Sequence, residues 1–293
     1  MILLGTSGST KCDWQLIKEG DIVSKFTSKG INPFFHDKET IAENILAIEE
    51  LTPYLDEIDV VFFYGTGCAT IELKNIVQRG LSSVFKRSNY YINHDIVAAA
   101  FATYEGVPNF TGLIGTGSSS CFFDGDVVRQ EAQAIDYILG DEGSGAYFGK
   151  QLLSAYLRNK LPKEISSDFD DTFKLSRHEI LENVYLTPYP NVYLASFISF
   201  IEERKSHPYF DLMVANGLAL YLDLNICSFN NYKKYKTHFV GSIPYNFEDI
   251  LRKVAAERSI EIGTIIKEPI DKLVEYHINK YYITKDEKGH ARN

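Results

Sequence analysis

The sequence lacks the features that mark membrane-spanning, secreted and nucleic-acid-binding proteins. Its 293 residues contain no apolar run close to the ~20 residues that a membrane-spanning helix requires. The opening segment, MILLGTSGSTK, is too short and has no basic stretch before it, so it does not resemble a secretory signal. The net charge is −9 and no stripe of Lys and Arg occurs, which disfavours a phosphate backbone as ligand. We expect no membrane partner and no nucleic acid partner.

Residues that build metal sites and nucleophilic sites are also scarce. The cysteines form no C-x-x-C pair and the histidines show no H-x-x-x-H spacing, so we expect no metal site made of protein ligands. The scattered cysteines are typical of reduced thiols in a cytoplasmic protein; they are Cys12, Cys68, Cys121 and Cys227. The segment 115–118 is not a nucleophile elbow, because G-x-S-x-G is absent.

Two similar segments are present instead, ILLGTSGSTKCDWQLIKEGDIV near the start and GLIGTGSSSCFFDGDVV about a hundred residues later. Each has an apolar run, a Gly-Thr turn rich in small residues, a second apolar run and an acidic-Gly hairpin signal. The first predicts strands at 2–4, 12–17 and 22–26. The second predicts strands at 113–114, 120–123 and 127–128. A three-strand meander is therefore expected twice.

Strand and helix patterns alternate after each meander. The first half predicts a helix over 37–51, a strand over 59–65, a helix over 71–84, a strand over 90–93 and a helix from Asp95. The second predicts helices over 145–161, 176–187, 193–206 and 208–231, a strand over 238–243 and a helix over 246–260. We interpret 162–174 as a charged surface loop and the last ten residues as a frayed tail. The fold class is α/β with two related lobes.

Both Gly-Thr turns have the composition of a phosphate-binding nest. Small residues let backbone N–H groups point into one concavity, and hydroxyl groups add donors. The residues are Gly8, Ser9 and Thr10 in the first turn and Gly115, Thr116 and Gly117 in the second. Lys11 could add a charge-assisted contact to a phosphate, and a solvated lysine at a strand edge is an equal alternative.

Several motifs, taken in order, resemble the BadF/BadG/BcrA/BcrD ATPase family and its bacterial N-acetylglucosamine kinase-like branch. They are SGSTKCDW, GINPFF, YGTGCA, HDIVAAA, LIGTGSSSC, YILGDEGSG and HFVGSIPYNF. The resemblance spans residues 1 to about 280 and implies two ribonuclease-H-like (actin-like ATPase) lobes, each a mixed sheet flanked by helices, with an interlobe cleft. The lobes are expected at 1–110 and 111–268, with a helix at about 269–285 packing back on the first.

The same resemblance implies an ATP-dependent kinase of an amino sugar, most closely N-acetylglucosamine. Its cofactors would be ATP and Mg²⁺, the metal being held mainly through the ATP phosphates. By position, Gly8–Lys11 and Gly115–Gly117 match the phosphate-binding turns, and Gly241 and Ser242 match an adenosine-contacting motif. Asp95 matches the catalytic aspartate. The positions that match sugar-binding residues are Asn32, Ser119, Asp141 and Glu142.

The residues themselves leave alternatives open. Asp95 stands at a strand-to-helix junction, where a carboxylate is either a general base or a helix N-cap. A dyad of His94 with Asp95 is disfavoured, because adjacent residues at a helix start rarely face the same way. GDEGSG at 140–145 is either a ligand loop with two carboxylates or a capped turn. Asn32 precedes a proline and either meets a polyhydroxy ligand or starts a turn.

Two positions depart from the family pattern. Thr6 stands where relatives carry an aspartate that helps to hold hydrated Mg²⁺, and Ser119 stands where they carry an asparagine directed at the sugar. The alternative function is therefore a weakened or inactive kinase homologue that senses a sugar or nucleotide. An ATPase serving a redox partner is less favoured, since no cluster-ligating cysteine pattern occurs. A homodimer is compatible with the resemblance, although no segment identifies an interface.

Overall fold

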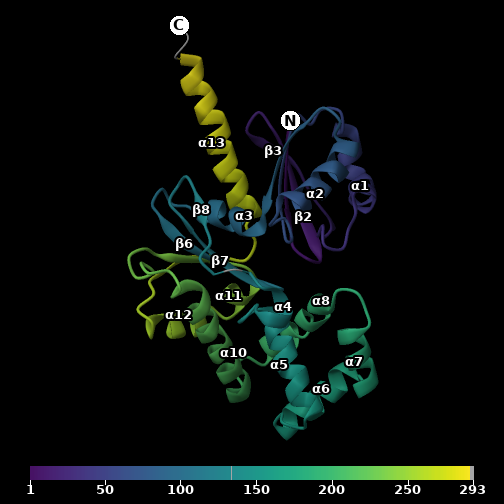
Figure 1. Ribbon diagram of the computed structural model, residues 1–293, viewed down its shortest axis with the longest axis vertical. Coiled ribbons are helices and arrows are strands. Elements are labelled where there is room, and N and C mark those ends of the chain that lie inside the picture. The colour runs from purple at the N-terminus through teal and green to yellow at the C-terminus, as the bar shows by residue number, and fades with distance from the viewer. Residues whose placement is uncertain (133, 291–293) are drawn as a thin grey trace. The chain divides into compact units, whose positions relative to one another are not determined.

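The computed structural model describes residues 1–132 and 134–290 (Figure 1). Contacts between Cα atoms divide the chain into two compact units. Unit 1 comprises residues 1–105 together with the segment from 268 onward, and unit 2 comprises residues 106–267. Each unit contains one five-stranded sheet. The chain therefore leaves unit 1 once and returns to it once.

Unit 1 is a mixed sheet with the strand order β3-β2-β1-β4-β5. The first three strands form an antiparallel meander, while β4 and β5 are parallel to β1. The strands are β1 (Ile2–Ser7), β2 (Lys11–Lys18), β3 (Asp21–Lys29), β4 (Val60–Gly65) and β5 (Asn89–His94). The helices are α1 (Lys38–Leu46), a 3₁₀ helix (Glu49–Tyr54), α2 (Ile71–Val84), α3 (Asp95–Ala102) and α13 (Ile270–His290).

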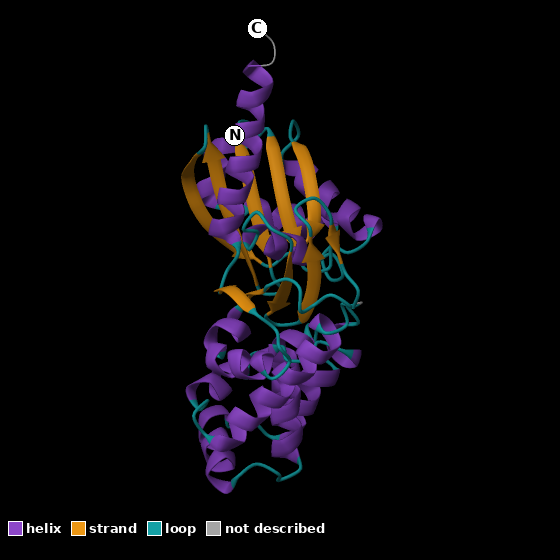
Figure 2. Ribbon diagram, turned by 90° about the vertical axis from the view of Figure 1, so that its left-hand side faces the viewer, coloured by secondary structure: helices purple, strands orange, loops and turns teal. Residues whose placement is uncertain are grey.

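Unit 2 repeats this sheet with the order β8-β7-β6-β9-β10 and holds most of the helices (Figure 2). Its strands are β6 (Asn109–Ile114), β7 (Ser118–Phe123), β8 (Val128–Arg129), β9 (Thr237–Val240) and β10 (Ile262–Ile266). The helices before the fourth strand are α4 (Asp136–Leu139), α5 (Gly145–Leu157), α6 (Lys163–Phe173), α7 (Arg177–Tyr185), α8 (Pro190–Ala195), α9 (Ile198–Glu203), α10 (Pro208–Tyr221) and a π-helical turn (Leu222–Ile226). Two helices, α11 (Ser242–Asn246) and α12 (Glu248–Ala256), lie between β9 and β10.

The two sheets share one topology. In unit 2 as in unit 1, the first three strands are antiparallel, and the fourth and fifth are parallel to the first. The predicted class, two related α/β lobes with mixed sheets flanked by helices, is confirmed. The strand β10 was missed by the sequence analysis.

Both faces of the unit 1 sheet are covered by helices. Alternation along the strands sends Leu3 and Phe63 to one face, where they share a buried cluster with Ile41 of α1 and Val77 of α2. The opposite face carries Tyr64, whose hydroxyl lies 2.8 Å from Nε2 of His277 on α13. The helices α13 and α3 contact each other on this face. The returning C-terminal segment is thus part of the core of unit 1.

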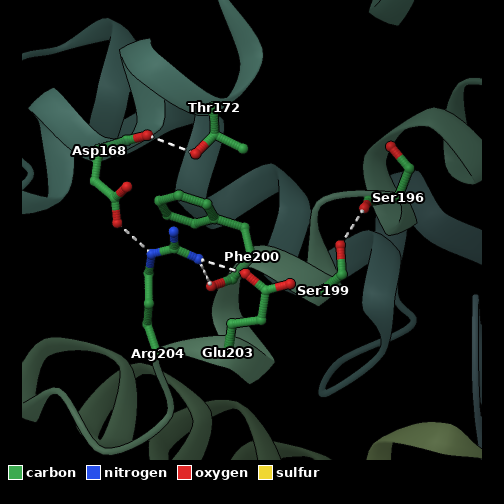
Figure 3. A network of polar contacts seen from close by, with 7 residues as sticks. All are labelled: Asp168, Thr172, Ser196, Ser199, Phe200, Glu203 and Arg204. Carbon is green, nitrogen blue, oxygen red and sulfur yellow. Dashed lines mark hydrogen bonds and ion pairs between the residues drawn. The ribbon is translucent and has the colours of Figure 1, made fainter.

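The segment 162–174 is a helix, so its interpretation as a surface loop was wrong. The apolar pair Ile165 and Phe169, one turn apart on α6, is buried in the core of unit 2. Figure 3 shows how the polar side is held: Nε of Arg204 donates to Oδ2 of Asp168 at 2.5 Å. The same guanidinium stacks on the Phe200 ring at 3.8 Å from its centroid. Burial of one apolar stripe outweighed the charge of the segment.

The last helix is longer than the sequence indicated. The helix expected at about 269–285 extends to His290, so the predicted frayed tail is helical over 284–290, and residues 291–293 lie outside the described residues. Among the described residues, every helix is too short or too polar to cross a bilayer.

Candidate functional site

The first turn, between β1 and β2, is held tightly against the chain that follows β3. The Gly8 amide donates to the Lys11 carbonyl at 3.0 Å, and the Gly30 amide donates to the Thr10 carbonyl at 3.0 Å. A Cβ atom at position 30 would lie 2.6 Å from the Gly8 carbonyl oxygen. Only glycine allows this approach, so residue 30 fixes the shape of the turn.

Lys11 at the end of this turn is paired with two carboxylates. Its Nζ lies 2.9 Å from Oδ1 of Asp13 and 3.2 Å from Oε1 of Glu268. The hydrogen bond to Asp13 raises the pKa of the Lys11 ammonium. The side chain is 47 % exposed, so the ammonium combines two ion pairs with access to solvent.

Asp95 lies at the first position of α3, directly after β5, and the N-cap of that helix is His94. Its Oδ2 accepts a hydrogen bond of 2.5 Å from Oγ1 of Thr66. Its Oδ1 is buried and has no hydrogen-bond partner in the described part of the chain. The carboxylate is therefore oriented by one oxygen and keeps an acceptor on the other.

The histidine beside this carboxylate does face it. Nδ1 of His94 lies 3.1 Å from Oδ1 of Asp95, although within residues 1–132 and 134–290 neither atom makes a hydrogen bond. The expectation that these neighbours point apart was wrong. Residue 94 is the last residue of β5, which leaves its side chain beside the start of α3.

Asn32 is buried and lies against Gly67, the residue after Thr66, which orients Asp95. Its Oδ1 accepts a 3.0 Å hydrogen bond from the Phe34 amide, which forms the turn at Pro33. A Cβ atom at position 67 would lie 2.5 Å from that same oxygen, so Gly67 permits the contact. Because Gly67 follows Thr66, Asn32 and Asp95 both contact the short segment that follows β4. The amide nitrogen Nδ2 of Asn32 makes no hydrogen bond with the described residues.

The second turn, between β6 and β7, supports a helix start. The Gly115 amide donates to the Gly117 carbonyl at 2.9 Å. The carbonyls of Gly115 and Thr116 accept from the first amides of α5, Gly145 at 2.8 Å and Ala146 at 3.1 Å. The turn thus satisfies donors that a helix start leaves open.

Asp141 and Glu142 close over this second turn. Oδ1 of Asp141 accepts from the Ser118 amide at 2.9 Å, and the Glu142 carbonyl accepts from the Ser118 hydroxyl at 2.9 Å. A Cβ atom at position 117 would lie 2.7 Å from Oδ2 of Asp141. Ser119 is buried, and its carbonyl accepts from the Tyr221 hydroxyl at 2.8 Å.

Gly241 and Ser242 lie at the junction of β9 and α11. The Gly241 amide donates to the Ile266 carbonyl at 2.9 Å, which ties the junction to β10. A Cβ atom at position 241 would lie 2.1 Å from the carbonyl oxygen of Ile114, the residue before the second turn. Unit 2 therefore brings the residues matched to adenosine binding next to those matched to phosphate binding.

Sequence reasoning missed three residues of the unit 1 site. Thr66 orients Asp95, while Asp13 and Glu268 hold Lys11. Thr66 stands after an apolar strand and before a helix, and that position was a usable signal. Glu268 is distant from Lys11 in sequence, and no local pattern predicts that the two residues form an ion pair. No group of three or more His, Cys, Asp or Glu able to hold a metal occurs among the described residues.

Comparison with known proteins adds a relative of known structure. No family model and no curated protein matches the chain. A crystal structure of a putative N-acetylglucosamine kinase from Porphyromonas gingivalis is 33 % identical, with a TM-score of 0.90, over 96 % of this chain and 100 % of that one.

More distant structures share the fold alone. A putative N-acetylglucosamine kinase from Chromobacterium violaceum has a TM-score of 0.65 at 14 % identity, over 94 % of this chain and 98 % of that one. A ROK family glucokinase from Streptomyces griseus, in complex with glucose and AMPPNP, has a TM-score of 0.53 at 15 % identity, over 94 % of this chain and 97 % of that one.

The paired mixed sheets match the actin-like ATPase fold of the sugar kinases. At 33 % identity over its full length, the Porphyromonas gingivalis protein is close enough to assign the family. The chain belongs to the sugar kinase family that this protein represents.

Proposed function

We propose that the protein is an ATP-dependent kinase of an amino sugar, with N-acetylglucosamine as the first candidate substrate. The proposal is supported by the relative from Porphyromonas gingivalis and by the fold shared with a glucokinase bound to glucose and AMPPNP. Membership of the BadF/BadG/BcrA/BcrD family and a cytoplasmic location stay predictions from the sequence.

The observation that carries this proposal is the state of the Asp95 carboxylate. A sugar kinase needs a carboxylate that accepts the proton of the attacking hydroxyl while the phosphoryl group moves. Thr66 fixes Oδ2 of Asp95, and the buried Oδ1 has no hydrogen-bond partner among the described residues. We assign Oδ1 as the proton acceptor. A sugar hydroxyl would give this buried oxygen the hydrogen bond that it lacks.

We assign the ATP phosphates to the Gly8–Lys11 and Gly115–Gly117 turns and the adenosine to Gly241 and Ser242. Lys11 would offer its ammonium to a phosphate oxygen in exchange for one of its two carboxylates. When bound, Mg²⁺ would neutralise phosphate charge. The oxygen donors near the first turn fit this ion, because Mg²⁺ is usually held by one or two carboxylates plus phosphates and water.

The sugar is assigned to Asn32, Ser119, Asp141 and Glu142. Asn32 supports this best, because its oxygen is already bonded in the turn and its Nδ2 has no partner in the described part of the chain. An amide donor near the segment that orients Asp95 suits a hydroxyl or N-acetyl oxygen. Asp141 supports it less directly, since its carboxylate also holds the second turn.

A sugar or nucleotide sensor is the second candidate. Two observations favour it: position 6 holds a neutral hydroxyl, and Lys11 is already paired with Asp13 and Glu268. Both features would weaken chemistry at the phosphates more than ligand binding. If the wild type binds ATP and sugar but turns over only after Thr6→Asp, the sensor reading holds.

The test is ADP release by the wild-type protein, followed with a coupled assay across hexoses and N-acetylhexosamines. We expect N-acetylglucosamine to stimulate ADP formation more than glucose or N-acetylmannosamine does. ADP formation that no sugar stimulates would remove the kinase proposal. Thermal-shift measurements with the same sugars and ATP-Mg, run in parallel, would then separate a sensor from a protein that binds neither.

A further inference from the structure

We infer that Asp13 supplies, from the neighbouring strand, the carboxylate that position 6 lacks, and that it anchors the Mg²⁺ that accompanies ATP. This inference rests on the proposed function and names the metal-positioning residue of that same site. Thr6 stands where the family resemblance leads one to expect an aspartate. The relevant question is which acidic side chain shares its surroundings.

The register of the hairpin formed by β1 and β2 places an acidic side chain opposite Thr6. In the antiparallel pair of β1 and β2, Thr6 lies directly opposite Asp13. Directly opposed residues send their side chains to the same face of a sheet, with Cβ atoms about 4.5–5.5 Å apart. A carboxylate on residue 13 therefore reaches the space that a carboxylate on residue 6 would occupy. No slip of register occurs along this pair, since every residue from Ile2 to Ser7 has its partner.

Thr6 adds a hydroxyl on the same face. The residue is 9 % exposed, and its hydroxyl is not among the fully buried polar atoms that lack a partner. A metal-bound water or a phosphate could exchange a hydrogen bond with this hydroxyl. The side chain of Asp13, on the same face, is 21 % exposed and is thus partly open to such a ligand.

The charges around Asp13 fit a site that fills only with ATP. Its Oδ1 lies 2.9 Å from Nζ of Lys11, so the carboxylate is neutralised before nucleotide arrives. One carboxylate and a hydroxyl are too few to hold Mg²⁺ alone, which takes near-octahedral oxygen coordination and keeps several waters. Phosphate oxygens would complete the set and would also draw Lys11 to themselves. We expect the metal to bind Asp13 through one of its waters or directly, together with the nucleotide.

The experiment measures ATP affinity by calorimetry, once with Mg²⁺ and once with EDTA. We expect Mg²⁺ to tighten ATP binding to the wild type. Asp13→Asn should remove about 10–100-fold of that metal-dependent gain, while metal-free ATP binds as well or better because a negative charge has gone. Thr6→Asp added to Asp13→Asn should restore the gain. Mn²⁺ titrated into the ATP-saturated proteins and followed by electron paramagnetic resonance should show the same order.

The matched control is Asp21→Asn, an acidic residue at the start of β3 that pairs in register with Lys18, at the far end of β2 from the first turn. It should leave both affinities unchanged. If Asp13→Asn weakens ATP binding equally with and without metal, Asp13 only positions Lys11 and the inference is overturned. A metal-dependent gain that Asp13→Asn leaves intact also overturns it, while ATP binding stands. If the wild type binds no ATP with Mg²⁺ present, the proposed function and the role of Asp13 both fall.

Discussion

The two Gly-Thr turns come from similar sequences and join the first two strands of sheets with one topology, yet they are supported differently. The first turn, 8–11, ends in a lysine and is braced by Gly30, which follows β3. The second turn, 115–117, has no cation and is braced by a helix start and by Asp141. The first turn presents a positive charge, and the second presents backbone groups held in a fixed arrangement.

This difference indicates how one structural unit can serve two purposes. Strand pairing leaves the hairpin as the place where sequence can vary without disturbing the sheet. In unit 1 the variation brings a lysine and two carboxylates to the turn. In unit 2 it ties the turn to α5, so that ligand contacts there would be transmitted to a helix. The predictions that follow test this division, beginning with the largest effect.

The largest effect is expected for Asp95→Asn, which would show that the chemical step depends on unit 1. Turnover should fall by about 10²–10⁴-fold, because the amide cannot take a proton from the sugar. The measurement is sugar-stimulated ADP release beside ATP affinity by calorimetry. The same substitution at Asp141, in unit 2, should affect the sugar KM more than kcat. Loss of ATP binding together with turnover in Asp95→Asn would instead indicate a structural role.

Acid should destabilise unit 1 selectively. Burial lowers the pKa of His277 from 6.5 to about 4. Between these pH values the imidazole is neutral in the folded protein and protonated in the unfolded chain. Stability from this group is complete above pH 6.5 and is lost as the pH falls toward 4, by about 3 kcal/mol at most. The only tryptophan, Trp14, is 1 % exposed in the unit 1 core, so its fluorescence reports unfolding of this unit.

The variant for this test is His277→Gln. Its unfolding midpoint, followed by Trp14 fluorescence, should vary less between pH 6.5 and pH 4 than that of the wild type. His178→Gln is the matched control, since the His178 side chain is 86 % exposed. A wild-type midpoint that stays constant across this range would contradict the prediction.

A methyl group distinguishes the supports of the two turns. Gly30→Ala places a Cβ atom 2.6 Å from a backbone carbonyl oxygen of the first turn and should lower the free energy of unfolding by about 1–3 kcal/mol. Gly115→Ala in the second turn has open space and should stay within about 0.5 kcal/mol of the wild type. Urea titrations followed by far-UV circular dichroism measure both. Equal effects of the two variants would show that the turns are equally constrained.

The smallest effect is expected for Lys11→Met. Loss of one charged donor to a phosphate should weaken ATP binding about tenfold, and the difference should shrink at high salt. Lys18→Met is the control, because Lys18 lies on the same strand at the end remote from the first turn. Calorimetry at two salt concentrations measures the effect. An unchanged affinity would mean that Lys11 serves its two carboxylates alone.

Local patterns in the sequence were enough for much of the fold. The alternation in the two meanders and the buried run at 59–65 depend on neighbours in the chain, and these strands were predicted. The strand β10 was missed because its five residues are all half-buried and include Gly263, so that pairing with β9 alone defines it. The helix α6 was missed because its charges hid the apolar pair Ile165 and Phe169.

In the candidate site, too, local features could be predicted from the sequence, whereas contacts between distant residues could not. Turn composition and the position of Asp95 after a strand are visible in the sequence. The hydrogen bond from Thr66 to Asp95 depends on β4 lying beside β5, and the pairing of Thr6 with Asp13 depends on hairpin register. Such contacts join residues that no local spacing relates. Sequence reasoning therefore proposed the candidate reacting groups and missed the residues that contact and orient them.

The return of α13 to unit 1 has a consequence for synthesis of the protein. While the chain leaves the ribosome, residues 1–105 appear before unit 2, but the helix that covers Tyr64 is made after it. All of unit 2 can fold in the meantime, whereas one face of the first sheet is covered by α3 without α13. Nascent chains stalled before residue 268 should therefore attract chaperones that bind exposed aromatic surface, and release of the final helix should end that attraction.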